Sequence, residues 1–311
     1  MASLSELVRA DGQPVSAQPI LPRVSIPPFI EPPSGVSPVS VATGRATFAA
    51  LDNAGALADA SIGSAVLVPG FTGSKEDFMA ILAPLAARQV RAVSFDLTGQ
   101  FETPGPSDID HYSLGSFAAD VWAVAATLPR PLVLVGHSFG GLVVREAILA
   151  DPLAADGLAL VASGAGAIPT QQQDVLRRFV DVMGAYGLEA VWQGKRALDA
   201  AAGVPLPAPE IDQFLSRRFL SNAPASLQAM IEVLCGAPDQ VDALATVAPQ
   251  TTVVVGADDD AWPPDEQRKM AERLDATLLE LPGVGHSPAV DAPEAVADAV
   301  AELMPPPHLK R

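Results

Sequence analysis

A single serine lies between glycines in the pentapeptide Gly136-His137-Ser138-Phe139-Gly140. The apolar run 131–135 precedes it, and a helical pattern over 140–150 follows it. A turn from a buried strand into a helix presents its serine at the carboxyl edge of a sheet, and glycine tolerates the backbone angles of so tight a turn. The first amides of the helix have no intrahelical acceptor, and the helix dipole favours a negative oxygen beside them. The pattern predicts a nucleophile, Ser138, next to donors for an oxyanion.

A serine hydroxyl is a weak nucleophile that needs a base, and the chain offers four histidines, His111, His137, His286 and His308. His286 lies in a second glycine-flanked turn, after the last apolar run, 276–281. That position places it at the same sheet edge as Ser138. The side chain of His137 is expected to diverge from its neighbour Ser138, and the other two histidines lie in a long loop and in the C-terminal tail. We therefore predict that His286 is the base.

Three consecutive acids follow the apolar run 251–255: Asp258, Asp259 and Asp260. A carboxylate beside an imidazole base holds its tautomer and stabilises its protonated form. The loop 161–173, after the preceding apolar run, contains no carboxylate, so the acid is expected among these three. The residues alone leave the choice among them open, and a solvated acidic turn is the alternative interpretation.

Short apolar runs alternate with helical patterns along most of the chain. The runs cover 65–68, 92–95, 131–135, 158–162, 251–255 and 276–281, and the helical patterns cover 74–88, 113–128, 140–150, 264–274 and 291–304. Runs without polar alternation are typical of strands buried on both faces. The alternation predicts an α/β fold, in which a mostly parallel central sheet is flanked by helices.

Two segments depart from this alternation. Residues 168–245 contain helical patterns only, and an insertion at the carboxyl ends of strands overlies the place where ligands bind, so we expect a helical lid inserted between two strands. Residues 1–39 include a proline-rich stretch, and we expect an extended N-terminal arm. The core is then expected over residues 40–167 and 246–311.

The composition limits the partners of the chain. Of 311 residues, 49% are hydrophobic and 18% are charged, which predicts a sizeable buried core. The formal net charge of −17 disfavours nucleic acid and anionic membrane surfaces as partners. We see no apolar run long enough to span a bilayer and no signal-peptide pattern. The single cysteine, Cys235, cannot form an intrachain disulfide, and we expect a cytoplasmic protein.

The pentapeptide around Ser138 resembles the G-x-S-x-G nucleophile elbow of the α/β-hydrolase superfamily. The resemblance covers about residues 40–304 and implies the α/β-hydrolase fold. The order Ser138, Asp259, His286 is the order in which this fold carries its triad. The family's acid turn resembles G-x-x-D-x-x-x-P, which Gly256, Asp259 and Pro263 fit. The resemblance therefore selects Asp259, with Asp258 or Asp260 as the fallback.

The resemblance also implies an oxyanion hole formed by two backbone amides. One belongs to Phe139, directly after the nucleophile. The other is carried over to Phe71, in the turn Pro69-Gly70-Phe71 that ends the first apolar run. Relatives usually have a histidine where this chain has Pro69, and that departure removes a side chain that often braces the turn.

The activity that the resemblance implies is hydrolysis of a carboxylic ester through an acyl-enzyme, on a small-molecule acyl substrate and without a metal or organic cofactor. Relatives with aspartate at the elbow are excluded by Ser138. Hydrolysis of a lactone, a thioester or a carbon–carbon bond, perhydrolysis and acyl transfer to an alcohol are alternatives on the same triad. A non-catalytic receptor for a small apolar ligand is an alternative of another class. Oligomeric state and natural substrate are left open.

Two arginine pairs lie in the expected lid, Arg177-Arg178 and Arg217-Arg218, and each precedes a phenylalanine. We interpret them as solvated helix faces or as partners of the abundant carboxylates. Recognition of an acidic substrate is the alternative.

Overall fold

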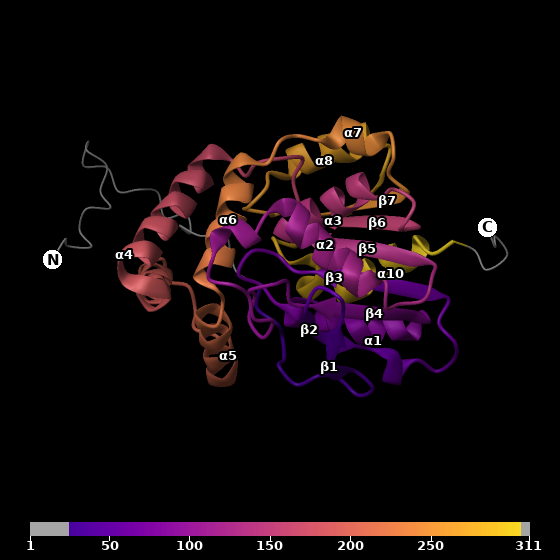
Figure 1. The fold of residues 1–311 in the computed structure, drawn as a ribbon, viewed down its shortest axis with the longest axis horizontal. Coiled ribbons are helices and arrows are strands. Elements are labelled where there is room, and N and C mark those ends of the chain that lie inside the picture. The colour runs from indigo at the N-terminus through magenta and orange to yellow at the C-terminus, as the bar shows by residue number, and fades with distance from the viewer. Residues whose placement is uncertain (1–24, 306–311) are drawn as a thin grey trace.

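A computed structural model describes residues 25–305 of the chain. Its centre is an eight-stranded sheet in the order β1-β2-β4-β3-β5-β6-β7-β8 (Figure 1). The strands are β1 (Ser37–Ala42), β2 (Thr47–Asp52), β3 (Gly63–Val68), β4 (Val90–Phe95), β5 (Leu132–His137), β6 (Gly157–Val161), β7 (Gln250–Gly256) and β8 (Thr277–Leu281). Neighbouring strands from β4 to β8 pair in parallel. β1 pairs with β2, and β2 pairs with β4, in the antiparallel direction. The mostly parallel sheet confirms the predicted fold class.

The six apolar runs correspond to β3 through β8, but β1 and β2 were not predicted. β1 lies at the edge of the sheet, and its sequence, SPVSVA, mixes polar and apolar side chains, none of which is buried. Such a strand lacks the continuous apolar run that marks a strand buried on both faces. It starts at Ser37, just inside the expected N-terminal arm of residues 1–39. Residues 1–24 of that arm lie outside the described part of the chain, so the arm stays a prediction.

Helices cover both faces of the sheet. On one face lie α1 (Met79–Ala87) and α10 (Pro293–Glu302), and on the other lie α2 (Leu114–Ala125), α3 (Phe139–Ala150) and α8 (Pro264–Arg273). Successive side chains of β3 serve the two layers in turn, since Ala65 and Leu67 join the first core and Val66 and Val68 join the second. This alternation is what a parallel strand with two covered faces requires.

Four helices connect β6 to β7, all within the segment expected as an insertion. They are α4 (Thr170–Ala201), α5 (Pro209–Leu220), α6 (Pro224–Gly236) and α7 (Val241–Ala245). Figure 1 shows α4, α5 and α6 together beside one end of the sheet. The backbone of α4 breaks at Gly187, where φ is 81°. Every helix in residues 25–305 falls short of the combined length and apolarity that a bilayer span needs.

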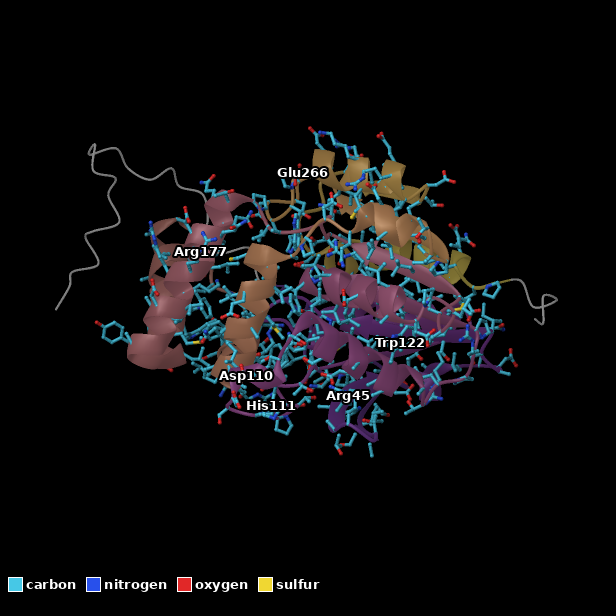
Figure 2. All side chains as sticks on the ribbon, turned by 45° about the horizontal axis from the view of Figure 1, so that its top comes forward. Arg45, Asp110, His111, Trp122, Arg177 and Glu266 are labelled. Atoms are coloured by element: carbon cyan, nitrogen blue, oxygen red, sulfur yellow. The ribbon has the colours of Figure 1, made fainter. Side chains whose placement is uncertain are left out.

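One of the two arginine pairs between β6 and β7 is solvated. Arg177 and Arg178 are exposed on α4, and Arg177 pairs with Asp174 of the same helix at 3.2 Å (Figure 2). The interpretation of this arginine pair as a solvated helix face is confirmed. The pair on α5 behaves differently and is described below.

Candidate active site

The turn between β5 and α3 consists of Ser138 alone. Its backbone lies at φ 54° and ψ −119°, a left-handed φ that L-residues adopt only when their surroundings hold them there. The amide of Ser138 donates to the carbonyl oxygen of Val161 at 2.9 Å, and its carbonyl oxygen accepts from Ser163 Oγ at 2.8 Å. These contacts with β6 and the loop after it fix the serine in the strained conformation and lift its side chain from the sheet edge.

The glycines beside Ser138 serve close packing rather than unusual backbone angles. Neither Gly136 nor Gly140 is among the described glycines with positive φ. A Cβ on Gly136 would lie 2.3 Å from the carbonyl oxygen of Gly140, and one on Gly140 would lie 2.2 Å from that of Val68. The expectation that these glycines supply special angles was therefore wrong, because the strain falls on the serine itself.

We expect Gly140→Ala to destabilise the protein, since its new methyl group meets backbone that cannot turn away. Overpacking of this kind costs about 1–3 kcal/mol in the free energy of unfolding. Gly184→Ala, on α4, is the matched control because nothing lies within 4 Å of the new Cβ. It should stabilise the protein by about 0.5–1 kcal/mol, as alanine does in a helix interior. Urea denaturation of both variants measures the difference, and equal stabilities would contradict this account of the elbow.

The structure brings Ser138, His286 and Asp259 together, as the sequence predicted. His286 Nε2 lies 2.9 Å from Ser138 Oγ, and His286 Nδ1 lies 2.9 Å from Asp259 Oδ1. All three residues are more than nine-tenths buried. With a proton on Nδ1, the imidazole donates to the carboxylate, and Nε2 is left to accept the hydroxyl proton of the serine.

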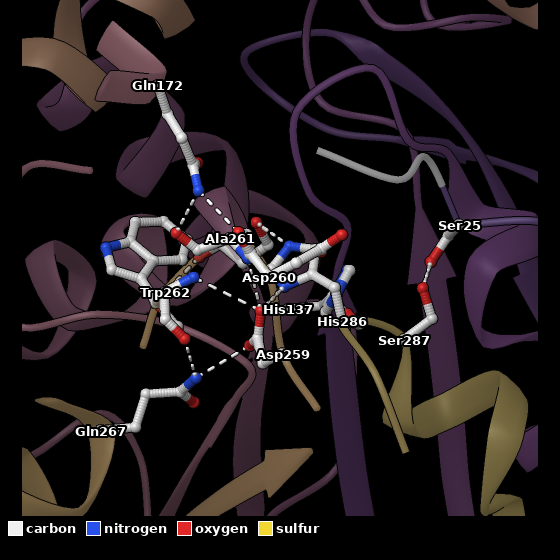
Figure 3. A network of polar contacts seen from close by, with 12 residues as sticks. Ser25, His137, Gln172, Asp259, Asp260, Ala261, Trp262, Gln267, His286 and Ser287 are labelled. Carbon is white, nitrogen blue, oxygen red and sulfur yellow. Dashed lines mark hydrogen bonds and ion pairs between the residues drawn. The ribbon is translucent and has the colours of Figure 1, made fainter. Parts of the chain in front are cut away.

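Asp259 is the member of the acidic run that meets the imidazole, and its carboxylate is held by further donors. Oδ1 accepts from the amide of Ala261 at 2.8 Å, and Oδ2 accepts from Gln267 Nε2 at 2.8 Å (Figure 3). Burial acts to raise the pKa of Asp259, but the interaction with His286 and these hydrogen bonds outweigh it and hold the pKa below its ordinary value. The carboxylate is therefore ionised at neutral pH.

Gln267, a buried residue of α8, was not identified from the sequence. Its amide also donates to the carbonyl oxygen of Trp262 at 2.9 Å, so it ties the acid loop to the helix that follows. The helix PDEQRKMAER is mostly charged, yet Gln267 shares its buried face with Met270 and Ala271. The sequence did hold a signal for its burial, because Gln267 stands three and four positions before the apolar Met270 and Ala271 and so shares their face of the helix.

His137 does not simply point away from the site, as we had expected. Its ring lies 5.0 Å from that of His286, and its Nε2 lies 2.6 Å from the backbone carbonyl oxygen of His286. Burial, with the charge of His286 adding to it, lowers the pKa of His137 to about 3. The ring is therefore neutral at physiological pH, and its Nε2–H donates to the carbonyl of the histidine turn.

Because His137 stays neutral in the folded protein, we expect it to make the fold sensitive to acid. Between pH 6.5 and about 3 the unfolded chain takes up a proton that the folded chain does not, which costs up to about 1.4 kcal/mol per pH unit. His137→Gln keeps a donor but cannot titrate. Its unfolding free energy, measured from pH 4 to 7, should therefore fall less steeply on acidification than that of the unmodified protein. Identical slopes would show that His137 is protonated in the fold.

The turn expected to supply the second oxyanion donor adjoins the elbow. A Cβ on Gly70 would lie 3.1 Å from Ser138 Cβ. Across the turns and loops of residues 25–305, the amide of Phe71 donates to no backbone acceptor, and that of Phe139 is the first of α3. Gln100 Nε2 donates to the carbonyl oxygen of Gly70 at 2.9 Å and so braces this turn. Gln100 is buried and was not identified from the sequence.

A narrow cavity of about 40 Å³ opens beside Ser138 and His286. That space holds about three water molecules. Its walls are mostly apolar and come from the sheet edge and from the helices between β6 and β7: Phe71, Ile168, Leu176, Phe179, Phe219, Leu234 and Ala261. Besides Ser138 and His286, the polar residues at the walls are Ser25, Thr72, Asp77, His137 and Lys195. Phe71 and Phe179 meet edge to face at 5.7 Å, so the predicted oxyanion residue also forms pocket wall.

A family model described as the alpha/beta hydrolase family matches residues 65–299 of the chain. The chain belongs to this family. The matched segment of the hydrolase runs from β3 into α10 and includes the elbow, the acid loop and the histidine turn.

Solved structures share the fold of this hydrolase. A thermophilic esterase from Thermogutta terrifontis superposes with a TM-score of 0.67 at 22% identity, over 86% of this chain and 100% of that one. The enol-lactonase from Burkholderia xenovorans LB400 gives 0.67 at 17% identity, over 85% and 99%. The thioesterase domain from the curacin biosynthetic pathway gives 0.62 at 20% identity, over 85% and 99%. Their differing substrates show that the common fold does not fix the bond that is cleaved.

Proposed function

We propose that this α/β hydrolase cleaves a carboxylic ester through a covalent acyl-enzyme. In this proposal Ser138 is the nucleophile, His286 the general base and acid, and Asp259 the group that orients and stabilises the imidazole. The single observation that carries it is the pair of 2.9 Å contacts that joins these side chains in line at an apolar cavity. Nucleophile, base and orienting acid within hydrogen-bond reach are the arrangement that acyl transfer needs.

The proposed reaction has two halves. As Ser138 Oγ attacks the acyl carbonyl carbon, its proton passes to His286 Nε2, and the carbonyl oxygen becomes an oxyanion. The amides of Phe71 and Phe139 would hold this oxyanion, and one such donor contributes about 2.7–4 kcal/mol to lowering the barrier. Collapse expels the alcohol, which takes the proton from His286. Water, deprotonated by His286, then attacks the acyl carbon. Collapse of the second intermediate breaks the bond to Ser138 Oγ, which takes the proton back from His286 as the acid leaves.

The size and lining of the cavity support a short apolar acyl group as the substrate. While the helices between β6 and β7 lie as they do here, a space of about 40 Å³ admits only a few heavy atoms. We propose that residues 168–245 act as a lid, as the sequence suggested, because α4, α5 and α6 all contribute side chains to the cavity. A longer acyl chain would then require these helices to move.

A series of p-nitrophenyl esters, from acetate to octanoate, tests the proposal together with a fluorophosphonate probe. We expect multiple turnovers, highest kcat/KM for the shortest acyl groups, and labelling of the protein by the probe. The thioester and lactone of the same short acid, assayed alongside, decide which acyl bond is preferred. Labelling without turnover of any acyl compound would contradict the hydrolase proposal and support the receptor alternative.

A further inference from the structure

Two adjacent arginines on α5 have different surroundings. Arg217 is exposed, whereas the side chain of Arg218 is only 1% exposed. Arg218 Nη1 donates to Asp77 Oδ1 at 2.7 Å, and its Nη2 donates to the backbone carbonyl oxygen of Ser25 at 2.8 Å. The guanidinium thus joins three segments that are distant in the sequence: α5, the helical turn of residues 75–78 and the segment that precedes β1. Of the two interpretations that the sequence offered for this arginine pair, a solvated face is wrong for Arg218, whereas pairing with a carboxylate is confirmed.

Asp77, one partner of Arg218, packs against the turn that holds Phe71. Asp77 Oδ2 accepts from the amide of Ser74 at 3.3 Å, and a Cβ on Gly73 would lie 2.3 Å from the same oxygen. The carboxylate therefore packs against the backbone just after the proposed oxyanion donor. Burial raises the pKa of Asp77 to about 6, against the opposing effect of Arg218.

Ser25, the other partner of Arg218, contacts the turn that holds His286. Ser25 Oγ lies 2.8 Å from Ser287 Oγ, and Ser287 directly follows His286 (Figure 3). Ser25 is itself buried and lines the cavity. One guanidinium therefore lies between the two turns that carry the proposed oxyanion donor and the proposed base.

Other charges nearby do not replace Arg218. Lys75, a buried cation on the same helical turn as Asp77, directs its Nζ to Asp96 at 3.0 Å and to Glu102 at 2.8 Å. It also meets Glu76 at 3.0 Å, so three carboxylates already surround it. If α5 moved away from the sheet, Asp77 would be left as a buried carboxylate without its counter-ion, which is strongly unfavourable.

We propose that Arg218 is a positioning residue that couples the seating of the helices between β6 and β7 to the geometry of the oxyanion turn and the histidine turn. The inference rests on the proposed hydrolase function and adds a condition to it. The site is complete only when α5 packs so that Arg218 contacts Asp77 and Ser25. Closure of the helices over a bound acyl group would then assemble the catalytic geometry in the same movement.

The test compares Arg218→Gln with Arg217→Gln, the adjacent exposed arginine of the same helix. We expect Arg218→Gln to lower kcat for p-nitrophenyl acetate by about 10²-fold, the loss that a misplaced catalytic geometry produces. The kcat of Arg217→Gln should stay within about twofold of that of the unmodified protein, because changes of exposed side chains usually have small effects. The double variant Asp77→Asn/Arg218→Gln should recover part of kcat, because an amide pair can hydrogen-bond without leaving a buried charge unpaired.

Melting temperature and circular dichroism identify any variant that fails to fold. In that case Ser287→Ala, which removes only the hydroxyl contact with Ser25, takes the place of Arg218→Gln and should lower kcat severalfold at an unchanged melting temperature. A folded Arg218→Gln with unchanged kcat, or a double variant no more active than the single one, would overturn the inference. Failure of the proposed function looks different, since the unmodified protein would then turn over no ester.

Discussion

Ser138→Ala is expected to lower kcat for p-nitrophenyl acetate by about 10⁶-fold, because loss of a triad nucleophile removes nearly all of the chemical advantage that the triad provides. Without Oγ no acyl-enzyme forms, and His286 has no hydroxyl proton to take. The backbone bonds of Ser138 to Val161 and Ser163 are kept, so the fold should persist. Steady-state kinetics with purified variants, supported by melting temperatures, measure the effect.

Ser64→Ala is the matched control for this experiment. Ser64 is a fully buried serine of β3, and its hydroxyl has no hydrogen-bond partner among the described residues. Removing a hydroxyl that makes no hydrogen bond should leave both activity and stability nearly unchanged. If Ser138→Ala retained a tenth of the unmodified activity, Ser138 would not be the nucleophile.

Asp259→Asn is expected to lower kcat by about 10⁴-fold, the cost of holding the triad imidazole in the wrong tautomer. The amide of asparagine can donate to His286 Nδ1, which leaves the proton on Nε2, where it can no longer accept from Ser138. The neighbouring acids supply matched controls, because His286 meets Asp259 and neither Asp258 nor Asp260. Asp258→Asn and Asp260→Asn should each retain most of the activity.

Kinetics at pH 7 and 8 test this second prediction with all three variants. Since the pKa of Asp259 lies below its ordinary value, the carboxylate is fully ionised at both pH values, and the deficit of Asp259→Asn should be the same at each. A comparable loss in Asp258→Asn would mean that another member of the acidic run orients the base.

The buried strands were predictable because both of their faces are covered. β3 through β7 appear in the sequence as continuous apolar runs between Gly, Pro and Asp residues. β8 also has an apolar run, but it lies at the edge of the sheet and only Leu281 is buried, so the expectation of burial on both faces was wrong for it. β1 gives no such signal, since its exposed edge permits Ser37, Pro38 and Ser40 among the apolar residues. The α/β architecture therefore followed from the central strands, and the antiparallel edge did not.

The three proposed catalytic residues followed from short motifs at strand ends, where the fold leaves little choice of position. The residues that support them depend on tertiary contacts that no local motif records. Arg217 and Arg218 look equivalent as a pair, but helical phase separates them. Arg218 lies three and four positions after the buried Leu215 and Phe214, so it shares the apolar face of α5. That periodicity was available in the sequence, whereas its partners, Asp77 and Ser25, were not.

The central claim is that Ser138 carries the acyl group between the two halves of the reaction. Rapid acid quenching of the protein during turnover of a p-nitrophenyl ester, followed by intact and peptide mass spectrometry, tests it most directly. We predict an adduct with the mass of the acyl group on the peptide that contains Ser138, formed within the first turnover and absent from Ser138→Ala. Turnover without an adduct at any quench time, or an adduct on a different residue, would contradict the account.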